Sequence, residues 1–273
     1  MNELQQVVAD LRAEGEELHR LLGNLREADW SRATRFKRWT IADVVAHLYF
    51  GDYLGLTSYR DADEFRAFMA NVQRSGLTLA DFTRQWLDGL SGPPLLAKWY
   101  HQFDAMCTLF AASDPGLRLA WAGPSMGIRM FATARLMETW AHGWAIYDLL
   151  GVSRTHTDRI RHIATLGART YGWTFANRGL PEPGPAPWLV LEAPSGARWE
   201  WHEPQPDNRI TGSAVEFCQV VTQVRNIADT GLEVVGAPAR AWMAIAQCFA
   251  GPPEAPPAPG TRRCDAPPVS DGD

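Results

Sequence analysis

Two side chains that can bind a metal ion lie four positions apart in an apolar, aromatic part of the chain. Glu138 and His142 belong to the run RLMETWAHGW, residues 135–144. On a helix, positions i and i+4 are neighbours with Cβ atoms about 5–6 Å apart, so one helix can present both side chains to one cation. The same spacing also produces ordinary contacts on helix surfaces. The pair therefore indicates a metal site only if a third ligand joins it.

His47 is the best candidate for that third ligand. It lies in the apolar run DVVAHLYF, residues 43–50, and shares a helix face with Val44 and Gly51. Such a face points inward, and Gly51 one turn later leaves room beside the imidazole. Catalytic zinc takes three protein ligands and keeps one position open, and metal sites in helical bundles use side chains from facing helices. The alternative, an ordinary core histidine, stays open at this point.

Four further residues are candidates for a role beside the metal. Arg135 lies on the predicted face of the Glu–His pair, where it can bind a substrate carboxylate or orient the glutamate; the alternative is a surface arginine in an ion pair. Asp52, near the edge of the His47 face, is either a partner of a ligand or a solvated residue. Tyr100 and His101 lie on the helix between the two ligand helices. Each is a candidate catalytic acid or base, or else a packing residue.

The helix that carries His47 has a well-specified start. Thr40 is the expected N-cap, and Asp43 stands at the third helical position in an Asp version of the capping box. Trp39 and Val44 occupy the positions of a hydrophobic staple, so we expect Trp39 to be structural. This start places His47 near the end of the second helical turn.

Apolar spacing and capping signals predict the other helices of the bundle. We expect a short helix and turn within residues 61–77 and helices at 4–25, 78–90, 95–112, 128–150 and 157–178, with Gly151 ending the one that carries the Glu–His pair. The proline-rich run NRGLPEPGPAP, residues 177–187, follows as a linker.

The pattern changes after the linker. WLVLEA and ARWEWHE are strand-like runs joined by Pro194-Ser195-Gly196, a hairpin signal. A helix near 213–228, a short strand in GLEVVG and a last helix in APARAWMAIAQCFAG complete this part. We therefore predict a helical bundle over residues 1–180, a small α/β domain over 186–250 and a disordered Pro-rich tail over 251–273.

Composition excludes several classes of function. The 273 residues carry a net charge of −5 without any cluster of Lys or Arg, which argues against a nucleic-acid surface. No apolar run reaches the ~18 residues of a membrane span, and the charged, periodic N-terminus is not a signal peptide. The four cysteines (107, 218, 248, 264) have no CxxC spacing, which favours free thiols in a reducing compartment. We expect a cytoplasmic protein, either a monomer or a homodimer.

The two candidate segments resemble motifs of a known family. WTIADVVAHLYFGD, residues 39–52, and ATARLMETWAHGWAIYDLLG, residues 132–151, resemble the DinB-like superfamily, in particular its mycothiol-dependent maleylpyruvate isomerase branch. The resemblance implies an α+β fold: a DinB-like four-helix bundle of the up-down-down-up type, followed by a small sterol-carrier-like α/β domain. It also implies that His47, Glu138 and His142 bind a divalent metal.

The resemblance extends along nearly the whole chain except the tail. TDRIRHIATLGARTYGWTFANRGLP, residues 157–181, and ITGSAVEFCQVVTQ, residues 210–223, resemble a subgroup described only as metal-binding proteins. Zinc suits a set of two histidines and one glutamate best, while nickel, iron and manganese also accept nitrogen and oxygen donors.

The chemistry that follows is the activation of a water or a thiol. A bound cation lowers the pKa of either group, and a free thiol with a pKa near ~8.5 is mostly protonated at pH 7. The resemblance implies a low-molecular-weight thiol such as mycothiol, bacillithiol or glutathione, which attacks a small organic electrophile. Release of the thiol isomerises the substrate, whereas retention makes the enzyme an S-transferase. Cys107 and Cys218 are more simply small core residues than nucleophiles.

Two other functions fit the same metal site. One is a metal-dependent tailoring enzyme of a secondary metabolite, a lyase, cyclase or hydrolase that uses no thiol. The other is a non-enzymatic metal- or ligand-binding protein. The resemblance implies basic residues, partly from the C-terminal domain, that hold an anionic substrate; Arg198, Arg209 and Arg225 are candidates, but the sequence matches no particular arginine to that role. Together with the twelve tryptophans, this indicates a small-molecule substrate that is larger, more aromatic or more apolar than a diacid.

Overall fold

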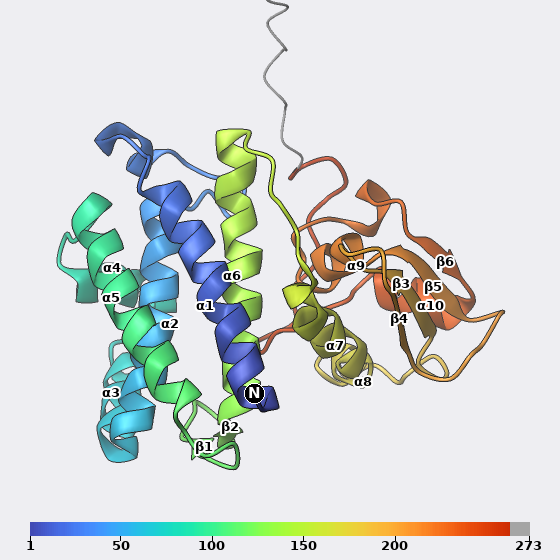
Figure 1. Cartoon of the computed structure of the whole chain (residues 1–273), viewed down its shortest axis with the longest axis horizontal. Helices are drawn as coiled ribbons and strands as arrows, with labels where there is room; N and C mark the ends of the chain where they lie inside the picture. The colour runs from blue at the N-terminus through green and yellow to red at the C-terminus, as the bar shows by residue number, and fades with distance from the viewer. Residues whose placement is uncertain (263–273) are drawn as a thin grey trace, which may run out of the picture. The chain divides into compact units, whose positions relative to one another are not determined.

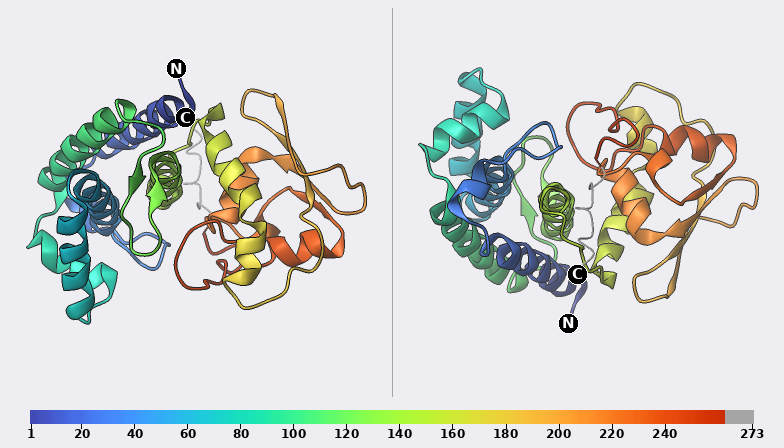
Figure 2. Two further views of the ribbon diagram at one scale, coloured as in Figure 1. Left: turned by 90° about the horizontal axis from the view of Figure 1, so that it is seen from below. Right: turned by 90° about the horizontal axis from the view of Figure 1, so that it is seen from above.

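The computed structural model describes residues 1–262, which form parts of two compact units. The first unit is Met1–Gly143 and the second begins at Trp144. None of the described helices combines the length and the apolar character that crossing a bilayer requires. Figures 1 and 2 show the helices and strands of each unit.

Helices dominate the first unit. Its helices and strands are α1 (Glu3–Leu22), a short 3₁₀ helix (Glu27–Ser31), α2 (Ile41–Arg60), α3 (Ala62–Arg74), α4 (Leu79–Leu87), α5 (Gly92–Ala111), the two-residue strands β1 (Arg118–Leu119) and β2 (Met126–Gly127), and α6 (Ile128–Leu150). α6 starts in this unit and ends in the second. As predicted, it spans residues 128–150 and ends at Gly151, whose φ of 66° no β-branched residue adopts easily.

The long helices α1, α2, α5 and α6 form the predicted four-helix bundle (Figure 1). α5 packs against both α1 and α2. Figure 2 shows α2 and α6 nearly end-on, with α1 and α5 beside them. In Figure 1, α1 and α6 run upward whereas α2 and α5 run downward. The expected up-down-down-up arrangement is confirmed.

The start of α2 is the one that its sequence predicts. The Thr40 side chain accepts a hydrogen bond from the backbone N–H of Asp43 at 3.0 Å, and the Asp43 carboxylate accepts one from the backbone N–H of Thr40 at 2.9 Å. This capping box satisfies two backbone donors that a helix start otherwise leaves unpaired. Asp43 also pairs with Arg84 of α4 at 2.9 Å, which ties the cap to a neighbouring helix.

The second unit combines short helices with a mixed sheet. The chain passes through a 3₁₀ turn (Asp158–Ile160), α7 (Arg161–Arg169), α8 (Tyr171–Ala176), β3 (Trp188–Glu192), β4 (Arg198–Trp201), β5 (Arg209–Ser213), α9 (Ala214–Val221), a 3₁₀ turn (Ile227–Asp229), β6 (Glu233–Val235) and α10 (Ala237–Met243). The strand order is β4-β3-β5-β6. β3 pairs antiparallel with β4, as the hairpin signal predicts, and parallel with β5.

Three expectations differ from the structure of the second unit. The helix expected over 157–178 is broken at Thr170, where the backbone leaves the helical region and the hydroxyl binds the carbonyls of Leu166 and Gly167. α7 packs on α9 and α8 on α10, so the compact units divide at Gly143 rather than after residue 180. α9 ends at Val221, short of the expected residue 228. α10 ends at Met243, although the last helix is expected to continue through the run APARAWMAIAQCFAG.

The expected disordered tail is in part an ordered segment of the second unit. The backbone carbonyls of Glu254 and Pro257 accept hydrogen bonds from the side chains of Gln223 and Asn226. Arg262 donates to the Gln223 carbonyl at 2.7 Å. Buried polar side chains need such partners, and residues 251–262 supply them. Residues 263–273 of the expected tail lie outside the described part of the chain.

Candidate metal centre

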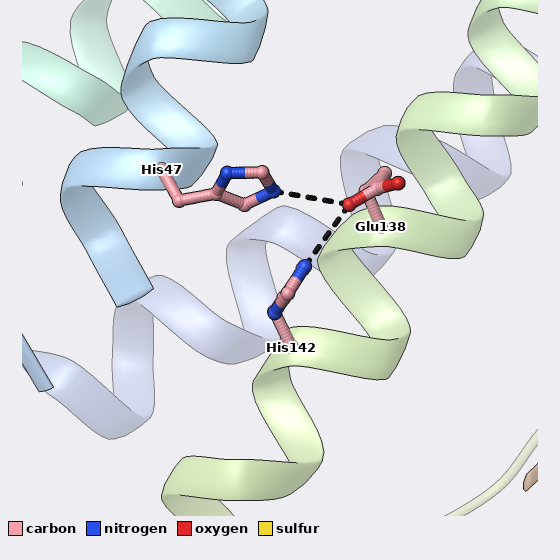
Figure 3. A group of neighbouring side chains, drawn as sticks. All are labelled: His47, Glu138 and His142. Atoms are coloured by element: carbon pink, nitrogen blue, oxygen red, sulfur yellow. Dashed lines mark hydrogen bonds and ion pairs between the residues drawn. The ribbon is translucent and has the colours of Figure 1, made fainter. Parts of the chain in front are cut away.

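α2 and α6 bring the three predicted ligands together (Figure 3). Nε2 of His47 lies 3.1 Å from Oε2 of Glu138, and Nε2 of His142 lies 3.0 Å from the same oxygen. One ligand atom from each residue lies within 4.8 Å of the other two. Within residues 1–262, these three residues, which we call the triad, are the only group of His, Cys, Asp and Glu side chains placed closely enough to share an ion.

The triad fits a small divalent cation. Ligands about 2.0–2.1 Å from a tetrahedral zinc ion lie about 3.3 Å from one another, close to the two separations around Glu138. Two imidazole nitrogens and a carboxylate oxygen are donors that zinc, nickel, iron and manganese accept. The side chains are 26%, 24% and 14% exposed in chain order, so the triad is partly accessible to solvent.

The electrostatics of the triad favour a charged Glu138 carboxylate beside a neutral His47 imidazole. Burial opposes ionisation of Glu138, but the hydrogen bonds from His142 and His47 outweigh it and hold the pKa of the carboxyl well below its usual value. Burial, helped by the nearby His142, lowers the pKa of His47, although Glu138 partly offsets the effect. A neutral imidazole and an ionised carboxylate are the forms that bind metals.

Arg135 connects the two ligand helices next to the triad. Its Nε donates to Oδ1 of Asp52 at 2.8 Å, and its Nη2 donates to the Leu48 carbonyl at 3.1 Å. The Arg135 and Asp52 side chains are only 6% and 0% exposed. Trp99 of α5 donates its indole N–H to the other Asp52 oxygen at 2.9 Å. Burial raises the pKa of Asp52, and Arg135 and Trp99 counteract it.

This buried network shows which of the alternative roles Asp52 and Arg135 have. Asp52 is a partner of Arg135 rather than a solvated residue. The Arg135 guanidinium is held by Asp52 and Leu48, which favours the role of orienting the Glu138 helix over that of clamping a substrate carboxylate. The room that Gly51 leaves is occupied by this guanidinium, because a Cβ at that position would lie 2.5 Å from Nη1 of Arg135.

The structure does not bring Tyr100 and His101 to the triad. The Tyr100 ring stacks on His19 of α1, with centroids 4.0 Å apart and planes 24° apart, and lines a surface depression on α1 and α5. His101 is exposed on α5. Periodicity places both residues on the correct helix, but the rotation of α5 turns Tyr100 toward α1. The packing alternative therefore holds for Tyr100, and His101 is a solvent-facing residue.

Two aromatic rings beside the triad were not predicted as site residues. The Trp39 ring lies nearly parallel to that of His142, with centroids 5.8 Å apart and planes 10° apart, and 5.4 Å from that of His47. The Phe36 ring meets His142 edge-on at 5.0 Å. The sequence signal for these rings is their position close to the N-cap Thr40: Trp39 directly precedes it, and Phe36 precedes Trp39 in the same loop. The staple prediction used that place for Trp39 but not for Phe36.

Cys107 and Cys218 are not reactive thiolates. Cys107, Cys218 and Cys248 are buried and form no disulfide. Burial raises the pKa of Cys107 to about 12 and that of Cys218 well above its usual value, so both thiols stay protonated at neutral pH. These two cysteines are therefore core residues, as expected from the sequence. Cys264 lies outside the described residues.

The three unmatched arginines of the second unit are engaged in ion pairs. Arg198 pairs with Glu200 at 2.8 Å, Arg209 with Glu233 at 2.9 Å and Arg225 with Asp148 at 2.6 Å.

Comparisons with known proteins agree with the resemblance in the motifs. The family model described as the mycothiol maleylpyruvate isomerase N-terminal domain matches residues 11–147, a range that includes the whole triad. Two uncharacterized proteins of Mycobacterium tuberculosis, MT0041 and Rv0036c, are each 40% identical to the chain over 247 residues, which is 90% of this chain and 96% of theirs.

A solved structure supports the fold. A mutant of the mycothiol-dependent maleylpyruvate isomerase superposes with a TM-score of 0.52 at 17% identity, over 80% of this chain and 88% of that one. At this identity the likeness concerns the fold alone, and it confirms the predicted combination of a helical bundle and a C-terminal α/β part. On the strength of the family model and the 40% identical relatives, the chain belongs to the family of the mycothiol maleylpyruvate isomerase N-terminal domain.

Proposed function

We propose that the protein is a metal-dependent enzyme that activates a low-molecular-weight thiol, mycothiol or a close analogue, for transfer to a small organic electrophile or for its isomerisation. The convergence of His47, Glu138 and His142 from two helices carries the proposal. Membership of a family named after mycothiol and an isomerase supports the thiol and the reaction class. Zinc is the first choice of metal, with nickel, iron and manganese as alternatives.

The residues of the triad have distinct parts in this function. His47 and His142 each offer an Nε2 atom as a metal ligand, and Glu138 offers a carboxylate that its own surroundings keep ionised. A divalent cation held there lowers the pKa of a thiol bound to it, so that thiolate is available near neutral pH. Arg135 and Asp52 keep the ligand helices in register. With Cys107 and Cys218 protonated and buried, the nucleophile comes from the co-substrate.

The surroundings of the triad favour an apolar or aromatic electrophile. The Phe36 and Trp39 rings lie next to His142 and offer flat apolar surface beside the ligands. Arg135, the cation closest to Glu138 in sequence, is neutralised by Asp52. A ring-bearing substrate gains stacking contacts at such a surface, whereas a small diacid gains less.

The metal part of the proposal is tested by elemental analysis of protein purified without chelator. We expect about one divalent ion per chain in the wild type and its loss in the His142→Ala variant. His101→Ala is the matched control, because His101 is an exposed histidine of the same unit, and it should retain the ion. Absence of metal from the wild type, before and after incubation with zinc, nickel, iron and manganese salts, would refute the metal site.

The thiol part is tested by calorimetric titration of metal-loaded and metal-free protein with mycothiol and with glutathione. We expect binding of mycothiol to the loaded protein and none to the metal-free protein or to His142→Ala. If the loaded protein binds neither thiol at millimolar concentration, the thiol mechanism is wrong. The metal site would then serve a thiol-independent lyase, cyclase or hydrolase, or a binding protein.

A further inference from the structure

A hydrogen bond from the second ring nitrogen is one way in which a protein orients a metal-binding histidine. Such a histidine ordinarily donates its second ring N–H to a carboxylate, a carbonyl or a water, which fixes the plane of the ring. Here each ring contacts Glu138 through Nε2. Within residues 1–262, neither Nδ1 has a hydrogen-bond acceptor from the protein. Because the outer torsion of a histidine side chain is broad, contacts of the rings themselves can also set their planes.

Aromatic rings surround His142 in two directions. Trp39 lies nearly parallel to it, with planes 10° apart, and Phe36 meets it edge-on, with planes 81° apart. Trp39 also contacts His47, whose ring is tilted by 54° to the indole. Centroid separations of 5.0–5.8 Å in these pairs lie in the range of about 4.5–7 Å where aromatic rings attract one another. Rotation of either imidazole would break these contacts.

The loop before α2 holds the two aromatic rings in place. Lys37 and Arg38 have φ values of 48° and 58°, a left-handed conformation that is uncommon outside glycine. The backbone N–H of Thr34 donates to the Trp39 carbonyl at 2.7 Å, and that of Trp39 donates to the Phe36 carbonyl at 2.9 Å. These two bonds close the turn. The Phe36 and Trp39 rings then pack edge to face, 5.1 Å apart.

We infer that Trp39 is a positioning residue of the metal centre. Its indole, supported by Phe36, fixes the planes of the His142 and His47 imidazoles so that both Nε2 atoms face Glu138. Aromatic packing thereby constrains the two rings from the protein side. The inference rests on the proposed function, because it concerns the same metal centre. It goes beyond it by assigning to Trp39 a role other than stapling the helix start.

The test compares Trp39→Phe, which keeps a flat ring, with Trp39→Leu, which keeps apolar bulk without a ring. Cobalt(II) is the probe, because its visible absorption reports the geometry of its ligands. Affinity is measured by competition with a chelator, and thermal unfolding of each metal-free variant is recorded. We expect Trp39→Leu to lose about 10–100-fold in affinity, the usual cost of removing an outer-shell partner, with an altered cobalt spectrum. Trp39→Phe should stay within about threefold of the wild type.

Trp86→Leu is the matched control for loss of an indole. Trp86 lies on α4 and packs against Tyr49, Tyr53 and Phe50, away from the triad. Its replacement should lower the melting temperature without changing cobalt affinity or spectrum. Equal affinities and spectra in the wild type and a folded Trp39→Leu variant would overturn the inference. If Trp39→Leu does not fold, Phe36→Leu tests the same packing from the other side of His142, and wild-type behaviour there is equally decisive.

This experiment separates the inference from the proposed function. If the wild type itself binds no cobalt, the metal site is wrong. If the wild type binds cobalt and the ring-less variants bind it equally well, the metal site stands and only the positioning role of Trp39 is wrong.

Discussion

At the scale of single residues, one carboxylate oxygen organises the site. Oε2 of Glu138 faces both imidazoles at 3.0–3.1 Å. An oxygen in this position holds the Nε2 atoms of His47 and His142 close together. A cation bound between these three atoms would have all of them as ligands. Without a cation, the same oxygen is the hydrogen-bond partner of both histidines. Both Nε2 atoms therefore have a hydrogen-bond partner in the metal-free protein as well.

Replacing this oxygen tests its role in metal binding. Glu138→Gln keeps the shape of the side chain but removes its charge. We expect metal affinity to fall by more than the about 10–100-fold that is typical of outer-shell changes, because a charged direct ligand becomes a neutral amide. Chelator competition with cobalt(II) measures the effect. Affinity within threefold of the wild type would contradict the assignment of Glu138 as a ligand.

The lowered pKa of His47 predicts a pH dependence of stability in the metal-free protein. Burial, the first cause, makes the folded state bind this proton less tightly than the unfolded chain does. Between the folded pKa and the unfolded value near ~6.5, the unfolded state holds more protons, so the free energy of unfolding rises with pH. The contribution of neutral His47 to the free energy of unfolding is fully present above the unfolded pKa. It is lost as the pH falls from that value through the folded pKa.

The measurement is urea unfolding of chelator-treated protein at several pH values between 5 and 7.5. His47→Gln has no group that titrates there, so its free energy of unfolding should depend less steeply on pH than that of the wild type. An identical slope in the two proteins would contradict the assigned direction of the pKa shift.

At the scale of elements, the close approach of α2 and α6 depends on a glycine. Gly51 faces Arg135, and an added Cβ would lie 2.5–2.9 Å from Nη1, Cζ and Nη2 of its guanidinium. The guanidinium cannot move away freely, because Asp52 and Leu48 hold it. Gly51 and Arg135 thus set the separation of the two helices one turn from the triad. Gly55 has the same role one turn further along α2, because a Cβ added there would lie 2.4 Å from the Phe131 ring.

Gly51→Ala is therefore expected to destabilise the protein and to disturb the metal centre. Overpacking of this kind costs typically about 1–3 kcal/mol, and we expect a parallel loss of cobalt affinity as the helices separate. Gly23→Ala is the control: its φ is −64° and a Cβ there meets its nearest atom at 3.4 Å. Urea unfolding measures both variants. If Gly51→Ala and the wild type have equal free energies of unfolding, the Arg135 guanidinium can move aside without destabilising the protein, and the proposed role of Gly51 is wrong.

At the scale of the whole molecule, α6 belongs to both compact units. Its first part supplies Glu138 and His142, and its last turns supply Asp148, which binds Arg225 of the second unit through two hydrogen bonds of 2.6 and 2.7 Å. The Arg225 and Asp148 side chains are only 10% and 11% exposed. Arg225 also lies over the Trp144 ring at 5.1 Å. This pair is thus the buried anchor of the end of α6.

Breaking this pair tests how far stability and the metal centre are separable. Arg225→Met leaves a buried carboxylate without its main cation, a change that costs about 3–5 kcal/mol, whereas Arg209→Met removes an exposed pair worth at most about 1 kcal/mol. We expect the first variant to be clearly destabilised and the second to resemble the wild type. Both should bind cobalt normally when folded, because the triad lies in the first unit. A loss of cobalt affinity in folded Arg225→Met would contradict this separation.

Local signals in the sequence determined the ligand-bearing helices of this protein. The Thr40–Asp43 capping box set the start of α2 and hence the place of His47, and Gly151 set the end of α6. The i, i+4 spacing of Glu138 and His142 needs nothing beyond one helix. Such features are predictable because hydrogen bonds and backbone preferences within a few residues decide them.

Only the tertiary structure decided which side chains meet across elements. It paired Arg135 with Asp52, turned Tyr100 toward His19 and placed Trp39 over His142. It also broke the helix at Thr170 and attached residues 251–262 to the second unit. These outcomes depend on the rotation and separation of packed helices and on buried polar groups finding partners far away in the chain. Periodicity along one segment contains no information about either.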